Sequence, residues 1–286
     1  MRIVSIVAKP HAESIKKVLE GVIDLLKDYE VDIFLDKRAA FALNRSIFNS
    51  DKEISEHSDF VIVLGGDGTL ISAVRILADK SIPILGINMG RLGFLSEVRL
   101  SECLDMIKQI MDGKYNIEKR MKLNCKLSAA ESTLFESEVL NDVVINKGAL
   151  ARMIDIELII DKHFVNNYRA DGIIFSTPTG STAYTLAAGG PIVYPTLNSI
   201  IITPICPHSL THRPIVISED SHIVVNIKKT NEQVYLTCDG QIGRKLDNVY
   251  DNVILIKKAS THVNLIVSNE RNYYAILREK LGWGTL

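Results

Sequence analysis

The strongest constraint on the fold is a change, near residue 120, in the order of the elements that the sequence predicts. Up to that point, short apolar strands alternate with helices whose apolar residues recur at helical spacing. The strands are expected at residues 2–7, 31–35, 59–64 and 82–88, and the helices at residues 15–26, 70–77 and 104–111. Strands that alternate with helices in this way predict right-handed crossover connections and a parallel sheet.

Beyond residue 120, strand-like segments follow one another with little helix between them. They are expected at residues 122–129, 134–145, 153–160, 172–175, 200–203, 214–217, 223–227, 234–237, 253–257 and 263–267. Many short strands separated by turn residues predict an antiparallel β-sandwich or a related β-rich domain. Apolar side chains return to helical spacing over residues 272–281, which predicts a final helix that packs back on the protein.

The length of 286 residues fits two domains, since about 150 residues are typical of one. We therefore expect an α/β domain with a Rossmann-like parallel sheet over residues 1–118 and a β-rich, β-sandwich-like domain over residues 119–268. Residues 269–286 then form the C-terminal helix and tail.

The composition argues against several classes of protein. The 33 Lys and Arg residues against 34 Asp and Glu residues give a net charge of −1, too little positive charge for sequence-independent binding of nucleic acid. No apolar run approaches the roughly 18 residues that cross a bilayer, and the apolar N-terminal stretch is too short for a signal peptide. The four cysteines are scattered, as is typical of reduced thiols. We expect a cytoplasmic protein with neither nucleic acid nor membrane as a partner.

A glycine-rich turn lies between a strand and a helix at Gly65-Gly66-Asp67-Gly68-Thr69. Glycines there permit positive φ and let the backbone approach a bulky ligand, and the free N–H groups of a helix start bind anions. Asp67 is unexpected in such a place, because its carboxylate repels phosphate. It caps the helix, as a favoured N-cap residue, holds a divalent ion, or accepts a proton from an attacking hydroxyl, a role worth roughly 10²–10⁴-fold in rate.

A second strand, turn and helix start is expected within residues 171–191. Pro178 and Gly180 supply the turn, and Ser181 or Thr182 can cap a short helix. So many hydroxyl groups fit either a site for a polar ligand or an ordinary capped turn.

Four motifs, taken in their order along the chain, closely resemble those of the NAD kinase family. They are Gly65-Gly66-Asp67-Gly68-Thr69, Leu140-Asn141-Asp142, the long segment from Asp171 to Ile192, and Cys238-Asp239-Gly240-Gln241. The first motif is also similar to loops of phosphofructokinases and of diacylglycerol and sphingosine kinases, whereas the long segment is far more specific. The resemblance extends from about residue 60 to Trp283.

The resemblance implies transfer of the γ-phosphoryl group of ATP to the 2′-hydroxyl of the adenosine ribose of NAD, which gives NADP. Asp67 would accept the proton of that hydroxyl and contact the dinucleotide. The phosphates of ATP would bind at Gly65, Gly66, Gly68 and Thr69. A divalent ion, Mg²⁺, would arrive with ATP and need few protein ligands, so no metal-binding residue is assigned. The family also implies a homodimer or a homotetramer.

The resemblance places the remaining contacts to NAD in the β-rich domain, which would bind the dinucleotide. With Gly68, they are Asn141, Asp142, Arg152, Arg169, Asp171, Thr182, Ala183, Tyr184, Thr185, Leu186, Ala187 and Gln241. Asn141 and Asp142 match the pair that hydrogen-bonds the adenosine, and Tyr184 would supply the surface on which it packs. The second residue of that pair is Glu in some members, so the reach of Asp142 to a ribose hydroxyl is shorter.

Two other functions fit part of this pattern. A lipid kinase of the diacylglycerol or sphingosine type would share the glycine-rich motif and the two-domain plan, but it should carry a membrane-facing segment, and none stands out. A non-catalytic dinucleotide sensor on the same fold is the second alternative, against which Asp67 argues. Formation of NADP from ATP and NAD separates the three.

Overall fold

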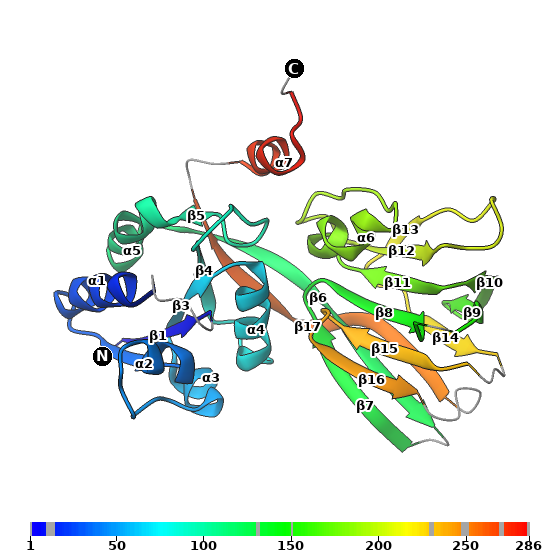
Figure 1. Ribbon diagram of the computed structural model, residues 1–286, viewed down its shortest axis with the longest axis horizontal. Helices are drawn as coiled ribbons and strands as arrows, with labels where there is room; N and C mark the ends of the chain where they lie inside the picture. The colour runs from blue at the N-terminus through cyan, green and yellow to red at the C-terminus, as the bar shows by residue number, and fades with distance from the viewer. Residues whose placement is uncertain are drawn as a thin grey trace. The chain divides into compact units, whose positions relative to one another are not determined.

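The structure is a computed structural model that describes residues 2–9, 15–129, 132–149, 151–228, 232–246, 252–268 and 272–284. The chain forms two compact units (Figure 1). Unit 1 comprises Met1–Lys119 together with Val263–Leu286, and unit 2 comprises Arg120–His262. The chain therefore passes from unit 1 to unit 2 and returns, each time within a strand.

Unit 1 contains a parallel sheet in the order β17-β4-β3-β1-β2, with β5 beside β4. Its strands are β1 (Ile3–Ala8), β2 (Asp32–Leu35), β3 (Phe60–Gly65), β4 (Pro83–Asn88), β5 (Val98–Arg99) and the last part of β17 (Asn252–Val267). Every residue of β3 is buried, as a central strand covered on both faces requires.

The helices of unit 1 are α1 (Ile15–Lys27), α2 (Lys37–Ala42), α3 (Asp51–His57), α4 (Asp67–Leu77), the short 3₁₀ helix η1 (Leu100–Glu102), α5 (Cys103–Met111) and α7 (Tyr273–Leu281). Every described helix of unit 1 except the short η1 has buried apolar side chains. Buried residues of α1, α2 and α5 share one core with β1, β3 and β4, and α3 contacts α4. In α7, Ile276 and Leu277 are buried, and Glu279 forms an ion pair at 2.9 Å with Arg99, the last residue of β5.

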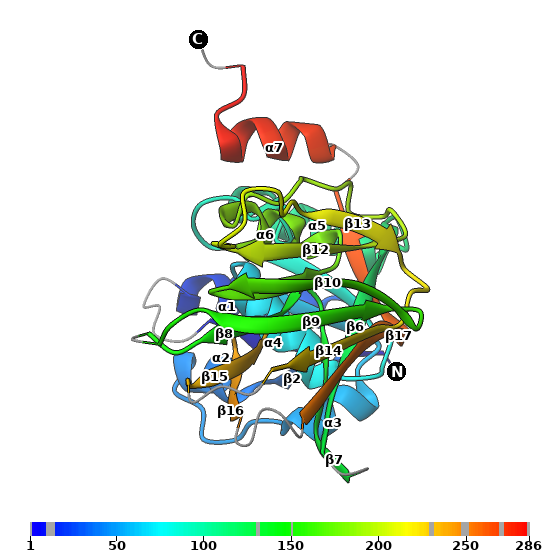
Figure 2. The same cartoon turned by 90° about the vertical axis from the view of Figure 1, so that its right-hand side faces the viewer.

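Unit 2 consists of two sheets of mainly antiparallel strands, which Figure 2 views from the side of this unit. The first has the order β10-β9-β14-β17 and continues through β6 to β7, and the second has the order β13-β12-β11-β8-β15-β16. The strands are β6 (Asn116–Ala129), β7 (Ser132–Val139), β8 (Asp142–Lys147), β9 (Ile154–Ile160), β10 (His163–Ala170), β11 (Gly172–Ser176), β12 (Ser199–Ile205), β13 (Ile215–Ser218), β14 (Ile223–Ile227), β15 (Val234–Cys238) and β16 (Ile242–Leu246). Two short helices, η2 (Thr179–Thr182) and α6 (Tyr184–Ala187), follow β11.

A single hydrophobic core joins the two sheets of unit 2. Alternate residues supply it, such as Ile156 and Leu158 of β9 in one sheet and Ile173 and Phe175 of β11 in the other. Alternation with a period of two places these side chains on the inner face of each sheet. The expected fold class, a parallel α/β domain with a β-sandwich and a C-terminal helix, is confirmed.

Several expected elements differ in detail. The strand expected at residues 134–145 is two strands, β7 and β8, which are separated at Leu140 and Asn141. The strands expected at residues 253–257 and 263–267 are one continuous strand, β17. The elements α2, α3, β10 and β16 were not expected. Among the described residues, no helix has the length and apolar character needed to span a bilayer.

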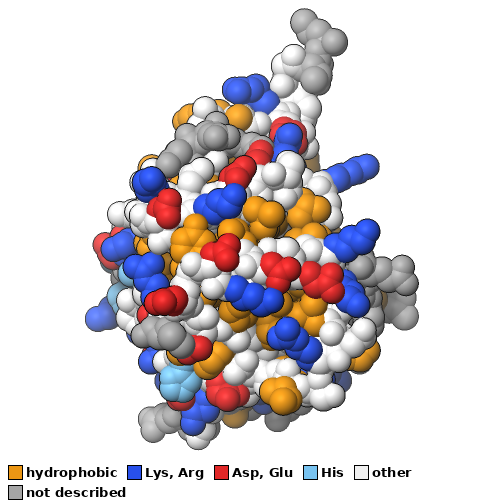
Figure 3. Space-filling view, turned by 90° about the vertical axis from the view of Figure 1, so that its left-hand side faces the viewer, with side chains coloured by type: hydrophobic (Ala, Val, Ile, Leu, Met, Phe, Trp, Pro, Cys, Tyr) orange, Lys and Arg blue, Asp and Glu red, His pale blue; other side chains and the backbone are white. Residues whose placement is uncertain are grey.

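The face of the molecule in Figure 3 carries Lys and Arg side chains interspersed with Asp and Glu side chains and with apolar ones. Neither sign of charge gathers into a patch on this face. The mixture is what the nearly balanced composition predicts.

Candidate functional site

The first expected loop lies at the carboxyl end of β3. The strand ends at Gly65, Gly66 is the N-cap of α4, and Asp67 is the first residue of that helix. The neighbouring parallel strand, β4, ends at Asn88, which lies opposite Gly65. The segments that follow these two strands therefore leave the sheet at the same edge. The Met89 N–H donates to the Gly65 carbonyl at 2.9 Å, which joins the two segments at their origin.

The carboxylate of Asp67 binds the segment that follows β4. It accepts hydrogen bonds from the backbone N–H groups of Phe94 (2.8 Å), Leu95 (3.1 Å) and Ser96 (3.0 Å), and from the Ser96 hydroxyl (2.9 Å). Asp67 therefore does not cap α4. The N-cap residue is Gly66, and no side chain makes a capping hydrogen bond there. The capping interpretation is wrong because four donors from residues 94–96 occupy the side chain instead.

The glycines of this loop leave room beside the backbone, and they do not adopt unusual backbone angles. None of Gly65, Gly66 and Gly68 has a positive φ, contrary to the freedom expected of them. Apart from the adjoining residues and the backbone of α4 itself, no atom of the described residues lies within 4 Å of where a β-carbon would stand on Gly66 or Gly68, which leaves room there for a ligand. At Gly93, by contrast, a β-carbon would overlap the Asp67 carboxylate, so only glycine lets residues 93–96 approach this closely.

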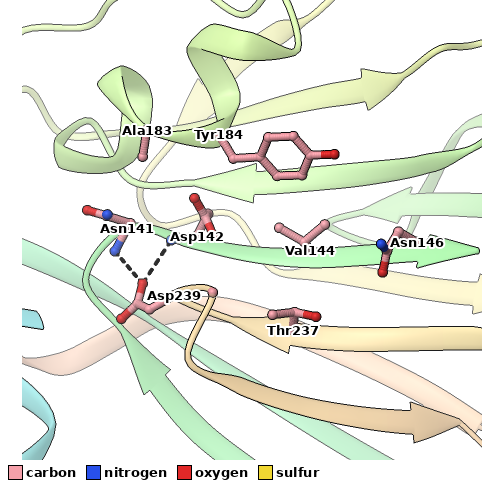
Figure 4. A pocket seen from close by; sticks show the side chains of 9 residues that line it. Asn141, Asp142, Val144, Asn146, Ala183, Tyr184, Thr237 and Asp239 are labelled. Carbon is pink, nitrogen blue, oxygen red and sulfur yellow. Dashed lines mark hydrogen bonds between the residues drawn. The ribbon is translucent and has the colours of Figure 1, made fainter. Parts of the chain in front are cut away.

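Unit 2 contains a pocket of about 380 Å³ between β8, β15 and the start of α6 (Figure 4). Asp142, Val144 and Asn146 alternate along one face of β8, and Thr237 of β15 lies opposite Val144 in the sheet register. Tyr184 lies across the pocket from this face, and its side chain is 44% exposed. The pocket thus combines polar groups on the sheet with an accessible aromatic ring, which suits a flat polar ligand.

Asp239 fixes the backbone at the start of β8. Its carboxylate accepts three backbone hydrogen bonds, from the N–H groups of Leu140 (2.9 Å), Asn141 (2.7 Å) and Asp142 (3.1 Å). Asp239 has a φ of +51°, a conformation that Asp and Asn tolerate better than most residues. These three bonds, which form the Asp239 clamp, fix the backbone that carries Asn141 and Asp142, both of which line the pocket (Figure 4).

Asp142 is buried, with only 4% of the residue exposed. Burial, with a smaller contribution from the negative charge of Asp239, raises the pKa of Asp142 to about 7. Both effects disfavour the ionised form. Near neutral pH the pocket therefore holds a carboxyl group that keeps its proton in a substantial part of the molecules and can then donate a hydrogen bond.

The second expected loop, which follows β11, contacts the residues just before β8. The Thr177 N–H donates to the Asn141 carbonyl at 2.9 Å, and the Thr177 hydroxyl donates to the Leu140 carbonyl at 2.6 Å. A β-carbon on Gly180 would overlap the backbone of Asn141, so glycine is required for this contact. Two motifs that lie far apart in the sequence therefore pack directly against each other.

The expected capping role of Ser181 or Thr182 is wrong. The N-cap of α6 is Ala183, and no side chain caps it. The Ser181 hydroxyl donates to the Pro178 carbonyl at 2.6 Å and accepts from the Val193 N–H at 3.1 Å, so it ties the turn to the chain beyond α6.

The structure brings some of the expected NAD contacts together and leaves others outside the lining of the pocket. Asn141, Asp142, Ala183 and Tyr184 line it, together with Val144, Asn146, Thr237, Asp239 and Gly240. Asp67 and Gly68 belong to unit 1. The expected contacts in unit 2 that lie outside the lining of the pocket, all of them described residues, are Arg152, Arg169, Asp171, Thr182, Thr185, Leu186, Ala187 and Gln241.

Four of those residues have distinct surroundings. Asp171 forms an ion pair with Lys147 at 3.7 Å. Arg169 is exposed on β10, and Arg152 is exposed just before β9. Thr185 is fully buried. In the part of the chain that the structure describes, no group of three or more His, Cys, Asp or Glu side chains could hold a metal ion.

Sequence reasoning overlooked two sets of residues. In unit 1 they are residues 94–96, which donate to Asp67, and Asn88, which donates to Ser96. In unit 2 the overlooked residue is Asp239, which accepts the backbone hydrogen bonds at the start of β8. A signal existed for the first set, because the segments after consecutive parallel strands often leave the sheet at the same edge. For Asp239, the signal was its position in the last of the four motifs.

Comparison with known proteins covers both units. A model of the ATP-NAD kinase N-terminal domain matches residues 4–115, and a model of the ATP-NAD kinase C-terminal domain matches residues 140–268. The NAD kinase of Geobacter metallireducens is 43% identical over 284 residues, which is 99% of each chain. The NAD kinase of Geotalea daltonii is 42% identical over 284 residues, again 99% of each chain.

Solved structures agree with these matches. Yeast NADH kinase, crystallised with NADH, is similar with a TM-score of 0.90 and 27% identity, covering 100% of this chain and 89% of the yeast chain. An NAD kinase from Archaeoglobus fulgidus in complex with ATP is similar with a TM-score of 0.78 and 27% identity, covering 99% of this chain and 100% of the archaeal one.

Proposed function

The chain belongs to the NAD kinase family, and from this we propose that it transfers the γ-phosphoryl group of ATP to the 2′-hydroxyl of the adenosine ribose of NAD. The product is NADP. The observation that carries the proposal is the match to NAD kinases along the whole chain, which includes both the Asp67 loop and the pocket in unit 2.

The pocket in unit 2 supports binding of the adenosine part of NAD. The Asn141 amide can donate and accept hydrogen bonds at the base or the ribose, and Asp142 can donate when it carries its proton. The exposed ring of Tyr184 offers a surface on which an adenine can stack. Arg152, Arg169, Asp171 and Gln241 would contact parts of the dinucleotide that extend beyond this pocket.

The loop that opens α4 supports binding of phosphate. The backbone N–H groups at the start of this 11-residue helix and its dipole both favour an anion. The space at Gly66 and Gly68 lets phosphate oxygens approach the backbone. Gly65, against which the Thr69 side chain lies, and Thr69 itself would complete the phosphate site. We take Mg²⁺ to enter bound to the phosphates of ATP, as part of the substrate, since Mg²⁺ keeps most of its ligands from water and phosphate.

Asp67 would act as the proton acceptor. In phosphoryl transfer the transition state is loose, so positioning and charge neutralisation supply most of the rate and a base adds a smaller factor. A carboxylate that residues 94–96 hold in one orientation needs no rearrangement to take the proton of the 2′-hydroxyl.

An assay of product formation tests this function. The purified protein is incubated with ATP, Mg²⁺ and NAD, and NADP is measured with an NADP-specific dehydrogenase. We expect NADP to accumulate with time. A folded protein that makes no NADP with several divalent ions and phosphoryl donors would contradict the proposal.

The same preparation distinguishes the two alternatives. NAD binding without turnover, measured by calorimetry, would support the dinucleotide sensor. Phosphorylation of diacylglycerol or sphingosine in vesicles would support the lipid kinase. Family membership favours neither alternative.

Assembly and location are further parts of the proposal. We propose a homodimer or a homotetramer in the cytoplasm, as the resemblance to the family implies. Light scattering coupled to size-exclusion chromatography tests the assembly, and a monomer at micromolar concentration would contradict it.

A further inference from the structure

The two oxygens of the Asp67 carboxylate are not equivalent. Oδ1 accepts three hydrogen bonds, from the Leu95 N–H, the Ser96 N–H and the Ser96 hydroxyl, at 3.1, 3.0 and 2.9 Å. Oδ2 accepts one, from the Phe94 N–H at 2.8 Å, among the residues that the structure describes. A carboxylate oxygen has two lone pairs, so Oδ1 is fully occupied and Oδ2 keeps one lone pair available.

The direction of the Ser96 hydroxyl bond is fixed by Asn88. Asn88 Oδ1 accepts from the Gly90 N–H at 2.7 Å, and because an N–H can only donate, the amide oxygen must face Gly90. Asn88 Nδ2 then donates to Ser96 Oγ at 2.9 Å. The single proton of the Ser96 hydroxyl therefore points at Asp67. Asn88 and Ser96 are 5% and 1% exposed, so little water competes for these bonds.

We propose that Asn88 and Ser96 are positioning residues, which orient Asp67 so that its Oδ2 accepts the proton of the 2′-hydroxyl. The inference rests on the proposed function. In the step, the ribose 2′-oxygen forms a bond to the γ-phosphorus of ATP, and the bond from that phosphorus to the bridging oxygen breaks as ADP leaves. The hydroxyl proton passes to Asp67 Oδ2. Asn88 and Ser96 keep Oδ1 engaged throughout and contact no substrate.

Steady-state kinetics of two variants test the inference. Ser96→Ala removes the hydroxyl and keeps the backbone N–H, and we expect kcat to fall roughly 10-fold while the KM for NAD stays within about two-fold, because one charge-assisted bond is lost away from the bound ligand. Asn88→Asp replaces the donor by an acceptor that attracts the Ser96 proton away from Asp67. It should lower kcat to a similar extent and add no further loss to Ser96→Ala.

A double-mutant cycle with Asp67 separates positioning from a general structural role. In an Asp67→Asn background, Ser96→Ala should leave the residual kcat unchanged within about two-fold, since the group that it positions is already gone. A structural role would reduce kcat by the same factor in both backgrounds. Urea unfolding confirms that each variant is folded.

Ser58→Ala is the matched control. Ser58 also has a buried hydroxyl in unit 1, bonded to the Ser5 hydroxyl at 2.5 Å, but it precedes β3, whereas Asp67 follows the other end of that strand. We expect it to lower stability without changing kcat. A wild-type protein that makes no NADP would contradict the proposed function and this inference together. An active wild type in which Ser96→Ala keeps full kcat, or raises only the KM, would overturn this inference alone.

Discussion

Replacement of Asp142 by asparagine tests the electrostatics of the pocket in unit 2. Asp142 is nearly fully buried and lies beside the Asp239 carboxylate, and its pKa is raised from 3.8 to about 7. In the unfolded chain the same group is ionised above about pH 4. Asp142→Asn keeps the size and hydrogen-bonding shape of the side chain and removes the titration.

The pH range of the effect follows from proton binding. Below about pH 4 the carboxyl group is protonated in both states, and it makes no difference to stability. Between pH 4 and pH 7 the native state keeps the proton and the unfolded state loses it, so the free energy of unfolding decreases as the pH rises. Above pH 7 both states are ionised, and the full cost of a buried charge remains.

The magnitude follows from the pKa difference. A rise from 3.8 to about 7 is a difference of about three pKa units. At 1.36 kcal/mol for each, the native state loses about 4 kcal/mol by pH 8. Asp142→Asn should therefore have nearly the same unfolding free energy as the wild type at pH 4 and exceed it by about 4 kcal/mol at pH 8.

Urea unfolding followed by circular dichroism at pH 4, 6 and 8 measures this difference. Asp155→Asn is the control, because it makes the same change at an exposed position on β9 of unit 2. We expect its effect to be small at every pH. A stability difference between Asp142→Asn and wild type that does not grow with pH would refute the reasoning.

Three further substitutions test the site. Asp67→Asn should lower kcat by at least roughly 10² and leave the affinity for NAD within a few-fold, and a kcat near that of the wild type would exclude a proton-acceptor role. Tyr184→Ala should raise the KM for NAD roughly 10-fold with a smaller effect on kcat, since stacking stabilises ground state and transition state alike; a larger loss in kcat would argue against stacking. Asp239→Asn tolerates the positive φ but places an amide near the N–H donors of residues 140–142. It should cost about 1–3 kcal/mol in urea unfolding and raise the KM for NAD, whereas unchanged values would show that the clamp is dispensable.

The architecture could be predicted because the two halves of the chain use different hydrophobic periods. Elements with a strong apolar pattern, such as α1 and β3, were predicted close to their actual bounds. The helices α2 and α3 were missed because six and seven residues give little periodicity. The sequence does contain residues typical of helix starts at both places. Asp36 caps α2, and Ser50 forms a capping box with Glu53 at the start of α3.

The strands that were missed or misjudged lie where burial is incomplete. β10 and β16 are at the edges of their sheets and expose most of their residues, so they lack the apolar alternation that marks a strand. Residues 134–145 were interpreted as one strand because apolar, strand-forming residues occur on both sides of Leu140 and Asn141. The break at Leu140 and Asn141 depends on the Asp239 clamp, nearly a hundred positions away.

The candidate site was predicted through its motifs, but its internal contacts were not. The sequence indicates that Asp67 follows a buried strand, yet three interpretations of its side chain remained open: a helix cap, a ligand of a divalent ion and a proton acceptor. Only the pairing of β3 with β4 brings residues 94–96 to Asp67, and this pairing is a tertiary property. Asp142 likewise has a raised pKa because of its burial and because a turn places Asp239 beside it.

A crystal structure of the protein with NAD bound tests the central claim most directly. The quantity to measure is the distance from the Asp67 carboxylate to the 2′-oxygen of the adenosine ribose. The account predicts that Oδ2 is the nearer oxygen and that it lies within a hydrogen bond of the 2′-oxygen, directly or through one water molecule. A 2′-oxygen that lies beyond one bridging water from Asp67 in every copy would contradict it.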